Sequence, residues 1–188
     1  MKLVPTASQT VGPYWLVGLD WPGANLLATD RTEGERIEIE GCILDGAGAP
    51  VIDAMVEIWQ ADAHGRYDRP EDRQDKPLDP SFKGFGRAPT DGEGRFRFMT
   101  VKPGPVPGPG NSLQAPHLVV AIFARGLLKQ LFTRLYFPNE PLNADDPVLN
   151  LIDDVDRRRT IIAERSEAGR YRWEIVLQGK DETVFFDC

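Results

Sequence analysis

Charged and apolar residues alternate along Glu35-Arg-Ile-Glu-Ile-Glu-Gly-Cys-Ile-Leu44. Successive side chains of a strand point to opposite faces, so this period of two predicts a strand with one buried face. The next residues, Asp45-Gly-Ala-Gly-Ala-Pro50, have the composition of a turn. Further along, the continuous apolar run His117-Leu-Val-Val-Ala-Ile-Phe123 predicts a strand that is buried on both faces. Together these stretches indicate a fold made mainly of strands.

Other segments show the same strand patterns, and turns separate them. The additional predicted strands are residues 55–59, 94–99, 131–137 and 171–177. Eighteen glycines and sixteen prolines divide the chain into short segments, which favours a sandwich over a helical fold. We therefore predict a mainly β, single-domain β-sandwich of two mixed sheets with long loops. One short helix is expected between Asp153 and Arg165.

Three segments lack strand or helix patterns: residues 1–34, 62–87 and 102–110. In the first, Pro5, Pro13 and Pro22 discourage helix. In the third, the closely spaced prolines have no N–H to donate, so no strand ladder is expected there. We predict that residues 1–34 form an irregular arm wrapped on a partner chain, and that residues 35–188 form the sandwich.

Composition narrows the possible functions. The net charge is −7, and nucleic-acid binding needs clustered cations, so we expect no nucleic-acid partner. No apolar run approaches the ~18 residues that span a bilayer, and the N-terminal residues lack the apolar stretch of a signal peptide. We expect a cytoplasmic protein with no membrane contact. The two cysteines, Cys42 and Cys188, make no disulfide framework, and Cys42 is expected to be a small buried apolar residue.

Short motifs along nearly the whole chain resemble those of the intradiol ring-cleavage dioxygenases. They are Ser8-Gln-Thr-Val-Gly-Pro-Tyr14, Glu57-Ile-Trp-Gln-Ala-Asp-Ala63, Gly65-Arg-Tyr67, Phe85-Gly-Arg87, Thr100-Val-Lys-Pro-Gly104, Ala115-Pro-His117, Leu135-Tyr-Phe137 and Asp181-Glu-Thr-Val-Phe-Phe-Asp187. Each motif alone is weak, but their order and combined extent are specific. The resemblance implies a β-sandwich and an enzyme that opens a catechol ring with O2.

The resemblance also implies a ferric ion held by two tyrosines and two histidines, and this sequence matches only half of that set. Tyr67 and His117 stand at ligand positions, whereas Val106 and Val119 stand where the second tyrosine and second histidine belong. Gln114 replaces an arginine near the iron. Valine has no lone pair to donate, so we expect no metal and no catalytic residue in this chain alone. Fe(III) is expected in a partner chain.

In this family an iron-free chain pairs with an iron-bearing beta chain, forms larger oligomers with it and lines the shared active site. The resemblance assigns substrate contacts to Gly12, Pro13, Tyr14 and Arg125. Arg125 could attract a small aromatic carboxylate substrate. The competing cation, Arg134, lies in the middle of a predicted strand, and we expect it to form a structural ion pair.

Three alternatives remain open from the sequence. The first is a metal-free sandwich that only builds an assembly, with Arg125 in a structural role. The second is an independent iron enzyme that uses Tyr67, His117 and His64. The third, a carbohydrate-binding sandwich, depends only on four scattered tryptophans, Trp15, Trp21, Trp59 and Trp173.

Overall fold

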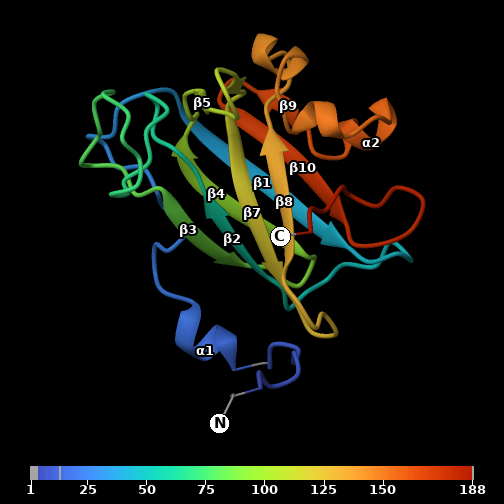
Figure 1. The fold of residues 1–188 in the computed structure, drawn as a ribbon. Coiled ribbons are helices and arrows are strands. Elements are labelled where there is room, and N and C mark those ends of the chain that lie inside the picture. Colours follow the sequence, from blue (N-terminus) through green and yellow to red (C-terminus); the bar gives the residue numbers. More distant parts are fainter. Residues whose placement is uncertain (1–3, 13, 188) are drawn as a thin grey trace.

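The computed structural model describes residues 4–12 and 14–187, which form two four-stranded sheets packed face to face (Figure 1). One sheet has the strand order β4 (Arg95–Val101), β1 (Arg36–Leu44), β10 (Arg170–Val176) and β9 (Glu164–Glu167). The other has the order β3 (Phe85–Pro89), β2 (Met55–Trp59), β7 (His117–Phe123) and β8 (Leu131–Tyr136). The predicted mainly β sandwich is confirmed.

Short elements occupy the connections. A two-stranded hairpin pairs β5 (Val106–Pro107) with β6 (Leu113–Gln114). The helical elements are α1 (Trp15–Leu19), α2 (Val155–Arg159) and two 3-10 turns, Pro141–Ala144 and Leu149–Leu151. No helix in the described residues has the length and apolar character needed to cross a bilayer.

The two sheets differ in strand direction. In the first, β1 runs parallel to β10 and antiparallel to β4, so this sheet is mixed, as expected. In the second, every neighbouring pair is antiparallel, so the prediction of two mixed sheets is wrong for this one. The turn over residues 124–130 returns the chain directly from β7 to β8, and such a short connection can join only antiparallel strands. We refer to them as the mixed sheet and the antiparallel sheet.

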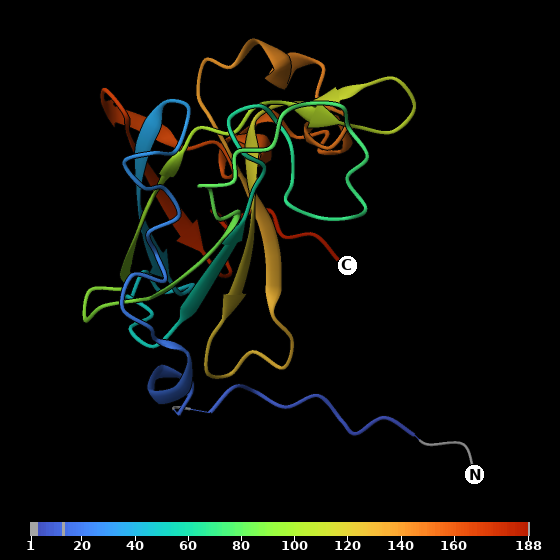
Figure 2. The same ribbon diagram turned by 90° about the vertical axis from the view of Figure 1, so that its left-hand side faces the viewer.

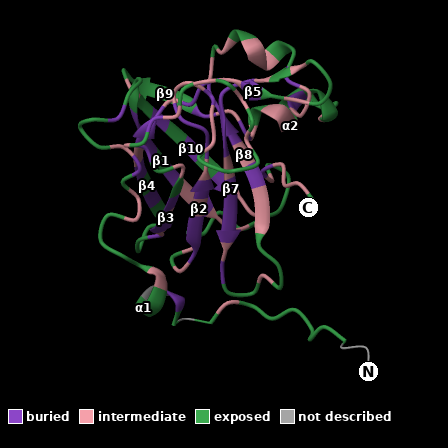
Figure 3. Ribbon diagram, turned by 60° about the vertical axis from the view of Figure 1, so that its left-hand side comes forward, coloured by how far each residue is buried: buried purple, intermediate pink, exposed green. Residues whose placement is uncertain are grey.

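The main core fills the space between the sheets, where buried strand segments face each other (Figure 3). Its members from the mixed sheet include Ile37, Ile39 and Phe98, and those from the antiparallel sheet include Ile58 and Leu118. The apolar run that forms β7 is buried at five of its seven positions, which confirms the prediction of a strand covered on both faces. A smaller, separate core cluster consists of Ala115, Tyr136, Leu149 and Ile161.

The N-terminal segment begins as an extended chain and then forms α1 below the sandwich (Figure 2). The prediction of an irregular arm is wrong for Trp15–Leu19, because these five residues fit between the prolines at positions 13 and 22 of the sequence. Residues 4–10 are all exposed.

Residues 24–27 lie between the edges of the two sheets. The amide of Leu27 donates to the Met99 carbonyl at 2.9 Å in the mixed sheet, and the amide of Arg87 donates to the Ala24 carbonyl at 2.9 Å in the antiparallel sheet. The Leu27 side chain, only 1% exposed, enters the main core. This part of the segment therefore packs on its own sandwich. Contact of the earlier residues with a partner stays a prediction.

Four further expectations need correction. The helix expected between Asp153 and Arg165 is limited to α2, because β9 begins at Glu164. Residues 102–110 do contribute a ladder, since Val106 and Pro107 pair with β6 at the end of a hairpin. The segment 62–87 is not wholly a loop, because β3 starts at Phe85. Cys42 is half-buried, and its thiol contacts the Glu93 carbonyl at 3.4 Å.

Candidate functional site

The outer face of the antiparallel sheet carries the residues expected near a metal. Trp59 of β2 lies opposite Val119 of β7, which lies opposite Arg134 of β8. His117 and Tyr136 form the neighbouring pair on the same face. Residues directly opposite each other on adjacent strands share a face, so these side chains form two adjacent rows.

Tyr67 reaches this face from the loop after β2. Its ring stacks on Trp59 with 6.0 Å between centroids and 4° between planes. Its backbone amide donates to the Asp72 carboxylate at 2.8 Å, which fixes the loop. Burial raises the pKa of the Tyr67 phenol, and the positive charge of Arg134 offsets this only partly. Tyr67 is therefore a neutral phenol at neutral pH.

His117 is buried at the start of β7, with 4% of its surface exposed. Its Nδ1 lies 2.7 Å from the Ala115 carbonyl, which can only accept, so Nδ1 carries the proton and donates. Burial and then the charge of Arg134 lower the His117 pKa to about 4. The ring is accordingly neutral at pH 7.

Val106 and Val119 complete the set of positions, and a backbone contact joins the loop before Val106 to the loop of Tyr67. Val106 is buried in β5, and the amide of Gly104 donates to the Asp62 carbonyl at 2.9 Å, joining its loop to the loop of Tyr67. Neither valine offers a donor atom to a metal. Within residues 4–12 and 14–187, no group of three or more His, Cys, Asp or Glu side chains could hold an ion. The residues present do not fit an iron centre.

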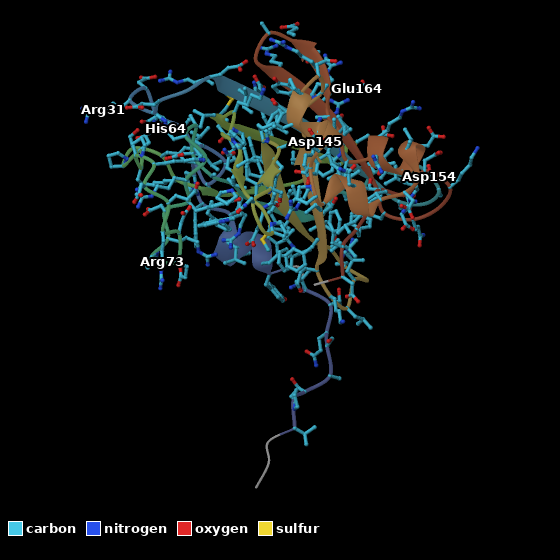
Figure 4. The ribbon with its side chains drawn as sticks, turned by 45° about the horizontal axis from the view of Figure 1, so that its top comes forward. Arg31, His64, Arg73, Asp145, Asp154 and Glu164 are labelled. Carbon is cyan, nitrogen blue, oxygen red and sulfur yellow. The ribbon has the colours of Figure 1, made fainter. Side chains whose placement is uncertain are left out.

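His64 does not add the missing ligand. Its Nε2 lies 2.9 Å from a carboxylate oxygen of Glu33, and Figure 4 shows it beside the N-terminal segment that carries Arg31. The independent iron set of Tyr67, His117 and His64 therefore has no support in the geometry.

Arg134 has different partners from those expected. It forms no salt bridge among the described side chains, so the predicted structural ion pair is wrong. Its NH1 donates instead to Gln114 Oε1 at 2.7 Å and to the Tyr136 hydroxyl at 3.2 Å. The half-buried guanidinium thus lies among the positions that the sequence marks as lost ligands. We call Arg134, Gln114, Tyr136, His117 and Tyr67 the Arg134 cluster.

A second group lies at the other end of β7. Arg125 follows the strand, its side chain is 66% exposed, and its Nε forms an ion pair with Asp53. The hydroxyl of Thr10 accepts from the Gly126 amide at 2.9 Å and donates to the Ala124 carbonyl at 3.3 Å. The N-terminal segment is therefore attached to both sides of Arg125, two residues before Gly12. Gly12 and Tyr14 are exposed, and Pro13 lies outside the described residues.

Comparison with known proteins identifies the family to which this chain belongs. A model of the dioxygenase family matches residues 12–179, which is most of the chain. The chain belongs to the intradiol ring-cleavage dioxygenases. The resemblance inferred from the motifs is confirmed.

Individual intradiol dioxygenases share much of the sequence and fold. The chain is 43% identical to the protocatechuate 3,4-dioxygenase alpha chain of Pseudomonas putida, over 100% of this chain and 98% of that one. It is 42% identical to the beta chain from Burkholderia cepacia, over 85% of this chain and 71% of that one. The dioxygenase domain of a carbohydrate-binding fusion from Streptomyces sp. SirexAA-E superposes with a TM-score of 0.63 and 27% identity, over 96% of this chain and 100% of that one.

Within this intradiol dioxygenase, the sequence did not indicate Thr10 or Asp53 as neighbours of Arg125. Asp53 precedes β2 in a turn of ordinary composition, and nothing in the sequence pairs it with a residue 72 positions later. Thr10 did lie within a family motif, and its position two residues before Gly12 was the available signal.

Proposed function

We propose that this chain is the iron-free alpha subunit of a protocatechuate 3,4-dioxygenase, acting with a beta chain that holds Fe(III). Its similarity over the full length to an alpha chain carries the proposal. The lack of ligand atoms at Val106 and Val119 supports it from the structure. The reaction proposed for the assembled enzyme is the opening of protocatechuate by O2 to 3-carboxy-cis,cis-muconate. The partner's ferric ion would activate the catechol ring toward O2.

The contribution proposed for this chain is to bind and orient the substrate. Gly12 lies in an exposed segment and, as a glycine, has no Cβ. A substrate or a partner backbone can therefore approach it closely. The two hydrogen bonds between Thr10 and the turn around Arg125 support a single substrate-contacting unit that combines the N-terminal segment with this turn. Because Asp53 engages only Nε of Arg125, both terminal nitrogens of the guanidinium can still donate to a carboxylate.

The substrate carboxylate provides the test of this role. In the co-expressed complex, Arg125→Ala is expected to raise KM for protocatechuate more than KM for uncharged catechol. The expected loss for a partly exposed charged contact is on the order of 1–3 kcal/mol. Lys129→Ala is the matched control, because Lys129 is an exposed cation in the same β7–β8 turn. Equal effects of Arg125→Ala on both substrates would contradict the binding role.

The Arg125–Asp53 ion pair favours one second candidate, a purely structural metal-free subunit. In that case Arg125 only stabilises the turn. Iron content and visible absorption of the chain, alone and with its partner, test the larger proposal. The alpha-subunit function predicts an iron-free colourless chain alone and a coloured, ring-cleaving complex. One iron per isolated chain with ring-cleaving activity would contradict it.

A further inference from the structure

The Arg134 cluster connects separate parts of the chain through one guanidinium. Arg134 lies on β8 and donates to Gln114 at the end of β6. It also donates to Tyr136, whose ring lies 5.5 Å from that of His117 on β7. The charge of Arg134 acts on Tyr67 in the loop after β2 as well. These are the parts of the chain that two tyrosines and two histidines would have to join through a metal.

A buried carboxylate, Asp146, lies beside the cluster. Asp146 has no exposed surface and accepts hydrogen bonds from the amides of Ala115, Val148 and Leu149 at 2.7, 2.8 and 2.8 Å. The Tyr136 hydroxyl donates at 3.2 Å to Oδ1, the same oxygen that accepts from the Val148 and Leu149 amides. Asp146 forms no direct salt bridge with any described side chain.

The Tyr136 hydroxyl links this carboxylate to the guanidinium. It accepts from Arg134 NH1 at 3.2 Å and donates to Asp146 Oδ1 at 3.2 Å. A buried carboxylate is costly unless hydrogen bonds and a nearby positive charge stabilise it. His117 is neutral, so the cation in this arrangement is Arg134.

We propose that the Arg134 guanidinium is the resident cation of this centre, and that it excludes a metal ion in addition to the lost ligands. The guanidinium holds the β5–β6 hairpin by a directional hydrogen bond to Gln114 and balances Asp146 through Tyr136. A metal ion between Tyr67 and His117 would meet a fixed positive charge of the same chain. This inference concerns the chain's own centre, and it holds or fails independently of the substrate role of Arg125.

Restoring the ligands separates the two causes of metal exclusion. We would compare the full chain carrying Val106→Tyr and Val119→His with the same chain carrying Arg134→Gln as a third change. Glutamine keeps a polar side chain that can bond Gln114 and Tyr136, but it removes the charge. The probes are Co²⁺ titration and iron content, with visible tyrosinate absorption as a second readout of Fe(III).

The expected result is one metal ion per chain in the triple variant. Metal binding by the double variant should be about 100-fold weaker or more. The repulsion between like charges ~4 Å apart near a protein surface is large enough for a change in affinity of that size. Equal affinities would overturn the proposal. A folded triple variant without metal affinity would also overturn it, because another feature would then exclude the ion.

A double-mutant cycle tests the charge balance without any metal and covers the case in which the ligand variants do not fold. The melting temperature is measured for Arg134→Gln, Asp146→Asn and the combination. We expect Arg134→Gln to lower it clearly in the native background and much less in the Asp146→Asn background, because the buried charge is then gone. Asp79→Asn is the matched control: Asp79 is also buried and accepts backbone amides, and its effect should add to that of Arg134→Gln. Additivity in the Asp146 cycle would overturn the proposal.

Discussion

At the scale of single residues, His117 shows how burial decides chemistry in this chain. Its pKa falls from 6.5 in an unfolded chain to about 4 in the fold. Between these values the unfolded state binds more protons, so acid destabilises the folded state. The stability that neutral His117 contributes is fully present above pH 6.5 and is lost as the pH falls toward 4.

We therefore predict a stability loss of roughly 2 kcal/mol from this residue between pH 7 and pH 5. His117→Gln should remove most of that slope while lowering stability at pH 7, since the bond to Ala115 is altered. Urea unfolding at pH 7 and pH 5 measures this change in the free energy of unfolding. His64→Gln replaces the chain's other histidine, whose side chain is 35% exposed, and should keep the slope. An unchanged slope in His117→Gln would contradict the assignment.

The candidate site also shows what a sequence can predict at this scale. Tyr67, His117, Val106 and Val119 were found because motifs mark their positions. The role of Arg134 was predicted wrongly, because its partners depend on strand register. Val119 faces Arg134 only once β7 and β8 are paired. Gln114 reaches it only through the β5–β6 hairpin, which the prolines concealed.

At the scale of elements, β1 and β4 are joined by an unusually close contact. Gly41 of β1 pairs with Phe96 of β4, and the Phe96 ring occupies the place where a Cβ on residue 41 would lie. The ring, 5% exposed, thereby covers the glycine and fills the main core. Glycine is required here by the neighbouring side chain, since no positive φ is involved.

Gly41→Ala is therefore expected to destabilise the chain by about 1–3 kcal/mol through overpacking. Phe96→Leu should cost stability in the native background and should recover part of the loss in the Gly41→Ala background. Chemical denaturation of the two single variants and the double variant measures the coupling. Simple addition of the two losses would show that the Phe96 ring is not what opposes a methyl group at position 41.

Whether an element could be predicted from the sequence depended on its length and on its pattern of apolar and polar residues. The long alternating or apolar strands β1, β4, β7, β8 and β10 were all expected, because each carries at least six residues with a buried face. The missed strands lack that signal. All four residues of β9 are exposed, and β3 includes a glycine and a proline within five residues. The five-residue α1 was missed because prolines near a helix were taken to exclude it.

At the scale of the whole molecule, net charge and exposed apolar surface bear on different binding partners. The net charge of −7 opposes the approach of an anionic substrate, so a local cation such as Arg125 matters more than the overall field. Apolar side chains are exposed on and beside α1, where Tyr14 and Val17 are 82% and 84% exposed. Trp21, 55% exposed, lies over the Arg87 guanidinium at 5.2 Å. Exposed aromatic and apolar groups of this kind are typical of protein interfaces.

If the proposed beta chain covers α1, Val17→Glu should weaken the complex about tenfold or more, because a charge would be buried in an apolar contact. The melting temperature of the isolated chain should barely change, since Val17 contributes nothing to the core. Light scattering on a dilution series of the co-expressed complex measures the association. Leu151→Glu is the matched control, because Leu151 is 77% exposed on a different element. Equal weakening by both variants would indicate a general effect of added negative charge, and an unchanged affinity in Val17→Glu would place the partner elsewhere.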